Sequence, residues 1–411
     1  MKKTFILIPV ILTSLMACHI ASVEPPVTAP ITLISPVDGS TLHDPTFVIA
    51  IAGSGYSFTH VDFYIDTVLV ASDSVTPYQY YWNIFNYRSD IAHSLVAIGY
   101  TSDTTNVRST TITVSVAYSL GFSIAADYRP NTQHAVGVRA YQNILFVPQG
   151  DQGLEVLDIS IITSPVFRSR FNTQGQLTHA VALYPYVYFA AGGQGVVKAD
   201  FSNPDSLMDV ARFMDQNLIK DVKLIGTNLI VLENGNAVVL SKNNPDSLIE
   251  LSRLAIPDVF HYVATLGNFA YLAGDNALYI VDCTNPHNIN LVGTFVNAGL
   301  SLGVAVADTF AFVANGDQGV TALSIANPSN PRSLSRFNPN PQILSVAAGD
   351  NTLFAASGNG DVYAIDYSAP DTLRQIDHLN IGNLLIGEID YQSPYLFVAA
   401  DAAVDILRFV R

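Results

Sequence analysis

Short apolar runs alternate with polar turns along the chain, and beyond about residue 119 they recur with a regular period. One such run opens each copy, and its aligned positions are Val136, Val181, Val222, Val263, Val304, Val346 and Ile389. The spacings between these positions are 45, 41, 41, 41, 42 and 43 residues. A period of about 40–45 residues with four strands per unit is typical of a β-propeller blade. The pattern therefore predicts seven repeated β-sheets.

Each copy continues with an aromatic and β-branched run, such as Tyr186–Ala190, which suits a buried pleated surface. Gly-rich turns follow, as at residues 150–153 and 316–319, because such turns require positive φ. The third run ends in Asp or Ser, which predicts a turn closed by the side chain, and a proline follows four residues later in most copies. These end positions are Asp158, Asp200, Ser241, Asp282, Ser324 and Asp366.

Two irregularities concern the length of the copies. In the first copy the proline stands at Pro165, seven residues after Asp158, which predicts a three-residue insertion and accounts for the spacing of 45. The last copy stops after its third strand, while residues 119–129 precede the first copy and read as a fourth strand. We therefore expect residues 119–129 to complete the last blade and close a ring formed by residues 119–411.

The copies resemble the LVIVD repeat, through runs such as Ala270–Ala273 with Leu278–Asp282, and Gly153–Asp158. The resemblance covers about the last 290 residues. It implies a propeller fold and no particular reaction, because the family is known mainly as a repeat.

Residues 31–117 lack this period and contain about seven short strands within about 90 residues, which fits an immunoglobulin-like β-sandwich. The stretch resembles bacterial Ig-like domains in the runs at residues 35–41, 61–66 and 76–82. Residues 108–116 are expected to form one final strand. Trp82, the only tryptophan, is expected in the core, with a sugar-stacking platform as the alternative. The predicted fold is thus all-β, an Ig-like sandwich followed by a seven-bladed propeller.

The first residues read as an export signal. Two lysines precede an apolar run that is too short for a stable membrane helix, so residues 1–17 are expected to be a signal peptide. The sequence Leu15-Met16-Ala17-Cys18 resembles a bacterial lipobox, which implies lipidation of Cys18 and attachment to a membrane. Residues 18–30 are proline-rich and predict a tether. The alternative is an ordinary signal peptide with an incidental cysteine.

Composition narrows the function classes. The formal net charge is −15 and no basic stripe is present, which argues against nucleic-acid binding and against electrostatic docking on anionic lipid. Cys283 is the only other cysteine and is expected to be a small buried residue. No P-loop, GxSxG, HExxH or CxxC motif occurs, so no catalytic residue and no cofactor is assigned.

Two sets of recurring carboxylates are expected to be structural. The turn residues Asp151 and Asp317 are isolated, whereas a calcium site needs several converging oxygens, so no metal is assigned. The strand-ending aspartates lie on different blades, which does not favour the close carboxylate pair of a glycosidase.

The candidate site is one mouth of the propeller channel. His134, His179 and His261 align at one position beside the innermost strand of blades 1, 2 and 4. The residues expected at or beside the same level are Lys220, Asp221, Tyr262 and Glu388. The histidines could bind a ligand or ion, or they could bond neighbouring backbone. We expect a lipoprotein of the outer membrane or cell surface, anchored to the membrane by lipid, that acts as a noncatalytic binding or scaffold module for a protein or glycan. The alternative is a hydrolase or lyase acting on envelope polysaccharide.

Overall fold

The protein is described from a computed structural model. It describes residues 29–411 apart from residues 44, 83, 85–86, 88–90, 103–104, 119, 131–133, 173–174, 297–298 and 383–384. In this part of the chain the regular structure consists of β-strands. The chain divides into two compact units, Met1–Ser119 and Leu120–Arg411. Cys18 and the expected signal peptide lie outside the described residues.

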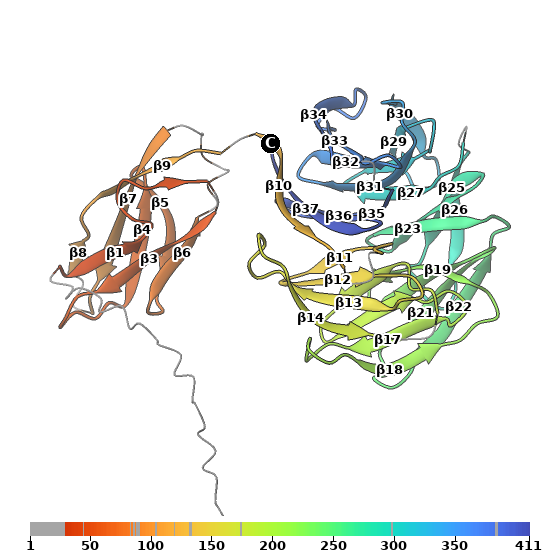
Figure 1. Cartoon of the computed structure of the whole chain (residues 1–411), viewed down its shortest axis with the longest axis horizontal. Coiled ribbons are helices and arrows are strands. Elements are labelled where there is room, and N and C mark those ends of the chain that lie inside the picture. Colours follow the sequence, from red (N-terminus) through yellow and green to blue (C-terminus); the bar gives the residue numbers. More distant parts are fainter. Residues whose placement is uncertain are drawn as a thin grey trace, which may run out of the picture. The chain divides into compact units, whose positions relative to one another are not determined.

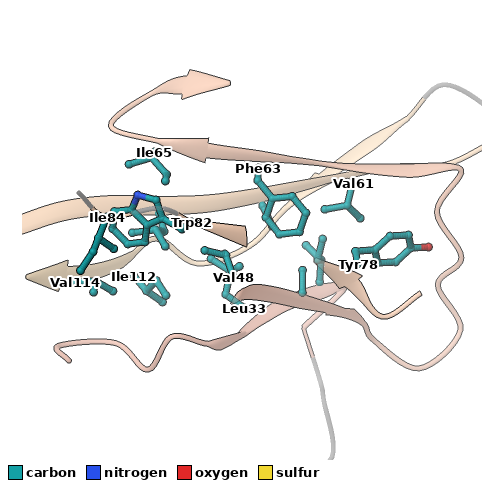
Figure 2. Packing of buried hydrophobic residues seen from close by; sticks show 14 of the residues in the cluster. Leu33, Val48, Val61, Phe63, Ile65, Tyr78, Trp82, Ile84, Ile112 and Val114 are labelled. Carbon is teal, nitrogen blue, oxygen red and sulfur yellow. The ribbon is translucent and has the colours of Figure 1, made fainter. Parts of the chain in front are cut away.

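The first unit is a sandwich of two sheets (Figure 1). One sheet has the order β1 (Ile31–Ser35), β3 (Thr46–Ala52), β6 (Tyr78–Trp82). The other has the order β2 (Thr41–Leu42), β9 (Ile112–Val116), β7 (Ile91–Tyr100), β4 (His60–Ile65), β5 (Val68–Asp73), with β8 (Asn106–Arg108) also paired to β7. Figure 2 shows the core between them, where Trp82 is fully buried.

The expected single strand over residues 108–116 is interrupted in the structure. It is divided between β8 and β9, because Ser109 leaves the regular ladder. The Ser109 hydroxyl accepts a hydrogen bond from the Ala97 N–H at 3.0 Å and donates to the Thr110 carbonyl at 2.9 Å. Side-chain bonding of this kind competes with strand pairing.

The second unit contains seven four-stranded antiparallel sheets, here called blades 1 to 7. Blade 1 consists of β11 (Arg139–Tyr141), β12 (Ile144–Pro148), β13 (Leu154–Asp158) and β14 (Val166–Phe171). Blade 2 consists of β15 (Ala180–Leu183), β16 (Tyr186–Ala190), β17 (Val196–Asp200) and β18 (Met208–Phe213). Blade 3 consists of β19 (Ile219–Ile225), β20 (Asn228–Glu233), β21 (Asn236–Ser241) and β22 (Ile249–Ala255). Blade 4 consists of β23 (Phe260–Leu266), β24 (Phe269–Gly274), β25 (Ala277–Asp282) and β26 (Asn290–Val296). Blade 5 consists of β27 (Gly303–Ala307), β28 (Phe310–Ala314), β29 (Val320–Ser324) and β30 (Arg332–Phe337). Blade 6 consists of β31 (Ile343–Gly349), β32 (Thr352–Ser357), β33 (Asp361–Asp366) and β34 (Arg374–Asn380).

Blade 7 joins the two ends of this unit. It contains β35 (Ile386–Gln392), β36 (Tyr395–Ala400) and β37 (Ala403–Val410), and its outer strand is β10 (Gly121–Tyr128). Strand β10 pairs antiparallel with β37, as Figure 1 shows, and supplies the fourth strand that the last repeat lacks. Each innermost strand contacts the next around the ring, and β35 contacts β11. The blades therefore form a closed propeller around a channel lined by the innermost strands.

The strand register corrects the alignment of the first two copies. In every blade one residue of the innermost strand faces the third residue of the second strand, and these residues are Arg139, Val181, Lys223, Ala264, Ala305, Ala347 and Asp390. Their spacings are 42, 42, 41, 41, 42 and 43. The assumed equivalence of Val136, Val181 and Val222 was therefore wrong by two residues in blade 1 and one in blade 2. Bulges at the start of the inner strand in four other blades add a residue that the sequence pattern does not reveal.

The expected insertion after Asp158 is also absent. Asp158 pairs with Val166 and Asp200 pairs with Met208, so both loops span the same eight positions. Pro165 and Pro204 stand at different places in connections of equal length.

Candidate functional site

One end of the channel, here called the mouth face, is formed by the starts of the innermost strands and the Gly-rich turns between second and third strands. Backbone bridges tie a turn to the next blade at Gly150 with Leu177, Gly192 with Ile219 and Gly316 with Ile343. These turns thus have a structural role. No group of three or more His, Cys, Asp or Glu that could hold a metal ion occurs among the described residues.

A pocket of about 160 Å³ opens at the mouth face between blades 2, 3 and 4. It brings together three of the four candidate residues, His179, Lys220 and His261. The other polar and aromatic residues that line it include Gln176, Thr178 and Phe260.

The fourth candidate, His134, is not among the residues that line this pocket. Its Nδ1 lies 3.0 Å from a carboxylate oxygen of Asp401 in the last repeat. It therefore joins the first and last repeats next to the bridge between Ala135 and Asp401.

The three histidines do not share one position, so that prediction was wrong. Lys220 and His261 are the bulged residues at the start of their innermost strands. Thr178 is equivalent to them, because its N–H donates to Ala190, the fifth residue of the second strand. His179 therefore stands one position after the Lys220 level, and His134 two positions before it.

The seven repeats provide an internal comparison for this level of the channel. The equivalent residues are Val136, Thr178, Lys220, His261, Leu302, Leu344 and Gly387 in blades 1 to 7. Four blades thus fold with an aliphatic residue or glycine here. The polar residues occur in three consecutive blades and line one pocket, so the fold itself does not require them.

Hydrogen bonds orient both pocket histidines. His179 Nδ1 lies 2.9 Å from the Lys220 carbonyl, to which it donates, and its ring meets the edge of Tyr262 with centroids 5.3 Å apart. His261 Nε2 lies 2.6 Å from a carboxylate oxygen of Asp275. The ammonium of Lys220 has neither an ion pair nor a hydrogen bond to any residue that the structure describes.

Below the pocket a cluster of buried charges crosses the channel. Glu388 from blade 7 accepts hydrogen bonds from the Tyr262 hydroxyl and the Val138 N–H, both at 3.1 Å. Lys223 lies 3.1 Å from Asp221 and 3.9 Å from Glu388. Blades 1, 3, 4 and 7 are thereby joined at the axis.

Arg139 completes this cluster by pairing with Asp390 at 2.7 Å, and the Ala140 N–H donates to the same carboxylate. Burial alone would lower the pKa of Arg139, but the negative charge of Asp390 and of the neighbouring carboxylates holds the pKa of Arg139 above its usual range. Burial and the charge of Glu388 raise the pKa of Tyr262 well above normal, so this hydroxyl stays neutral. All three channel carboxylates therefore have cationic or hydrogen-bonding partners, which is an arrangement suited to holding blades together.

The strand-ending aspartates lie at the opposite end of the blades and close turns. Asp158, Asp200, Asp282 and Asp366 each accept a hydrogen bond from the N–H two residues later, at 2.7–2.9 Å. Hydrogen bonds from Ser160 lower the pKa of Asp158. These contacts satisfy the carboxylates without a ligand.

Comparisons with known proteins agree with this architecture. Residues 30–116 match the model of the bacterial Ig domain, and residues 133–173, 261–296 and 298–338 match the LVIVD repeat. No curated protein matches the chain.

Solved structures of similar fold include the WD40 β-propeller domain of Doa1, with a TM-score of 0.59, 12% identity, and coverage of 70% of this chain and 97% of that one. The β-propeller domain of Swd1 from Myceliophteria thermophila has a TM-score of 0.58 at 13% identity, covering 70% and 99%. The computationally designed protein Ika8 has a TM-score of 0.56 at 11% identity, covering 76% and 93%.

The chain is therefore an all-β protein that joins an Ig-like sandwich to a β-propeller, which confirms the predicted fold class. Blades 1, 4 and 5 of the propeller match the LVIVD repeat and the sandwich matches the bacterial Ig domain, in agreement with the resemblances. At these identities the solved structures show the fold alone. In the described part of the chain, no helix has the length and apolar character needed to cross a bilayer.

Proposed function

We propose that this protein is a binding module of the bacterial cell envelope, which holds a partner protein at the mouth face of its propeller without catalysis. The observation that carries this proposal is the pocket between blades 2, 3 and 4, where polar residues stand in place of the aliphatic residues or glycine of the other repeats. Binding residues concentrate where a repeated scaffold tolerates variation.

The charge cluster below the pocket favours binding over acid–base chemistry. A hydrolase needs carboxylates that are free to exchange protons with a substrate. Here Glu388 and Asp390 are buried and engaged by Tyr262, Arg139 and backbone N–H groups. The cluster supports the pocket from below.

Site-specific photocrosslinking tests the proposal. Leu218 lines the pocket and is 53% exposed, whereas Met208 is 62% exposed and begins β18 at the opposite end of the blades. A photoreactive residue at 218 should capture a partner in the native envelope, and the same residue at 208 should not. Capture at both positions, or at neither, would refute binding through the mouth face.

We further propose that lipid on Cys18 anchors the protein in the outer membrane or at the cell surface, because residues 15–18 resemble a lipobox. Cys18→Ser should abolish incorporation of labelled fatty acid and release the protein from membranes. Unchanged membrane association of the variant would contradict the anchor.

A further inference from the structure

The mouth pocket presents a lysine whose charge the protein leaves uncompensated. We propose that this pocket receives the carboxylate of an Asp or Glu side chain of the partner protein, with Lys220 as its ion-pair partner. This inference rests on the proposed function and names the group that the partner supplies.

Two acidic residues at the pocket, Asp221 beside Lys220 and Asp275 beside His261, are already engaged. Asp221 is fully buried, where it pairs with Lys223 at 3.1 Å and accepts the Val263 N–H at 2.9 Å. Asp275 pairs with His261 at 2.6 Å. In a chain with a formal charge of −15, a cation without a partner among the described residues is a local site for an anion.

The neighbouring side chains add hydrogen-bonding capacity. His179 uses Nδ1 on the Lys220 carbonyl, and His261 uses Nε2 on Asp275. In the described part of the protein, the second nitrogen of each ring therefore has no hydrogen-bond partner. Gln176 supplies an amide that lines the same pocket. Charge-assisted hydrogen bonds of a carboxylate to such groups are about twice as strong as neutral ones.

The size of the pocket favours a side chain over a whole ligand. Its volume of about 160 Å³ lies below the roughly 300–1,000 Å³ of typical small-molecule sites. An Asp or Glu tip inserted from a partner loop requires only a pocket for one group, whereas a polysaccharide requires an extended groove. A protein partner therefore fits better than a glycan.

Peptide pools test the chemistry directly. Immobilised random hexapeptides with a fixed central Asp, Glu, Asn or Gln are probed with the full chain, and uronic-acid oligosaccharides are spotted beside them. We expect the acidic pools to retain at least about tenfold more protein than the amide pools, as one charge-assisted hydrogen bond allows. Lys220→Gln should remove this preference and Lys220→Arg should keep it.

Lys242→Gln is the matched control, because Lys242 follows β21 at the end of blade 3 away from the mouth face. It should leave the preference unchanged. Lys220→Gln itself should fold, because the bonds from Thr178 and His179 go to the backbone carbonyl of residue 220.

Equal retention by all peptide pools, a preference that survives Lys220→Gln, or retention only by the oligosaccharides would overturn the inference. The outcome is separable from that of the proposed function. A partner captured at position 218 whose binding survives Lys220→Gln would leave the proposed function standing and refute the carboxylate. Absence of any partner at position 218 would refute the proposed function.

Discussion

Replacement of Asp405 by Asn should stabilise the propeller, and more so at neutral than at acidic pH. Asp405 lies on β37 opposite Asp127 of the closing strand β10 and is only 6% exposed. Its Oδ2 has no hydrogen-bond partner among the described residues. Burial and the charge of Asp127 raise its pKa to about 6, while Arg129 opposes the shift.

The sign and size follow from proton linkage. An Asp in an unfolded chain has a pKa near 3.9, so the folded state binds this proton more tightly than the unfolded state. The contribution of Asp405 to the stability of the propeller therefore falls as the pH rises from about 4 to about 6, and it is constant above that range. A shift of about 2 units corresponds to about 3 kcal/mol at neutral pH, which is an upper estimate for the gain in Asp405→Asn.

Urea unfolding at pH 4 and pH 7.5 measures this effect, followed by far-UV circular dichroism. Trp82, the only tryptophan, lies buried in the other unit, so its fluorescence reports that unit separately. We expect the free energy of unfolding of the propeller to be about 1–3 kcal/mol higher in the variant than in the wild type at pH 7.5, and to differ little at pH 4. The unfolding transition followed by tryptophan fluorescence should not change. An equal difference in the free energy of unfolding between variant and wild type at both pH values, or a less stable variant at pH 7.5, would refute the reasoning.

Three further outcomes are expected. Glu388→Ala should destabilise the propeller by about 3–5 kcal/mol in the same urea assay, because it leaves buried cations and donors without their shared acceptor. Gly235→Ala should lower the free energy of unfolding by roughly 1–2 kcal/mol, because Gly235 has a positive φ. Gly195→Ala should lower it further, because residue 195 also has a positive φ and a Cβ there would lie 1.9 Å from the Phe213 carbonyl oxygen. Cys283 should react with a thiol reagent only after denaturation, because burial raises its pKa to about 12; rapid labelling of the native protein would contradict that burial.

The architecture could be predicted from the sequence because each blade repeats local signals. The aromatic second strand, the Gly-rich turn and the Asp at the end of the third strand are separated by few residues, and Asp200 closes the turn as expected. Such features depend on neighbours in the chain, so their spacing alone indicates four-stranded units.

The register of the innermost strand could not be predicted. A bulge such as that at Lys220 inserts one residue into a strand that otherwise looks regular in sequence. The alternation of inward-facing and outward-facing residues then shifts by one position, and the sequence pattern does not show where this happens. The alignment assumed from the sequence is out by two residues in blade 1 and by one in blade 2, and it placed His134 and His179 at the level of His261.

The channel cluster was missed in part for a different reason. Asp221, Tyr262 and Glu388 could be placed near the mouth from their level in the repeat, but the pairing of Arg139 with Asp390 joins residues 251 positions apart. No local pattern marks these two residues as partners. Their contact depends on closure of the ring, which brings blade 7 against blade 1.

Zero-length crosslinking at Lys220 tests the central claim most directly. A carbodiimide joins an amine to a carboxylate only when the two are in contact, so mass spectrometry of peptides from the treated native envelope identifies what lies in the mouth pocket. The expected product is an amide between Lys220 and an Asp or Glu of another protein, with no such product at Lys242. An unmodified Lys220 in envelopes where Lys242 is crosslinked to a partner would contradict the account.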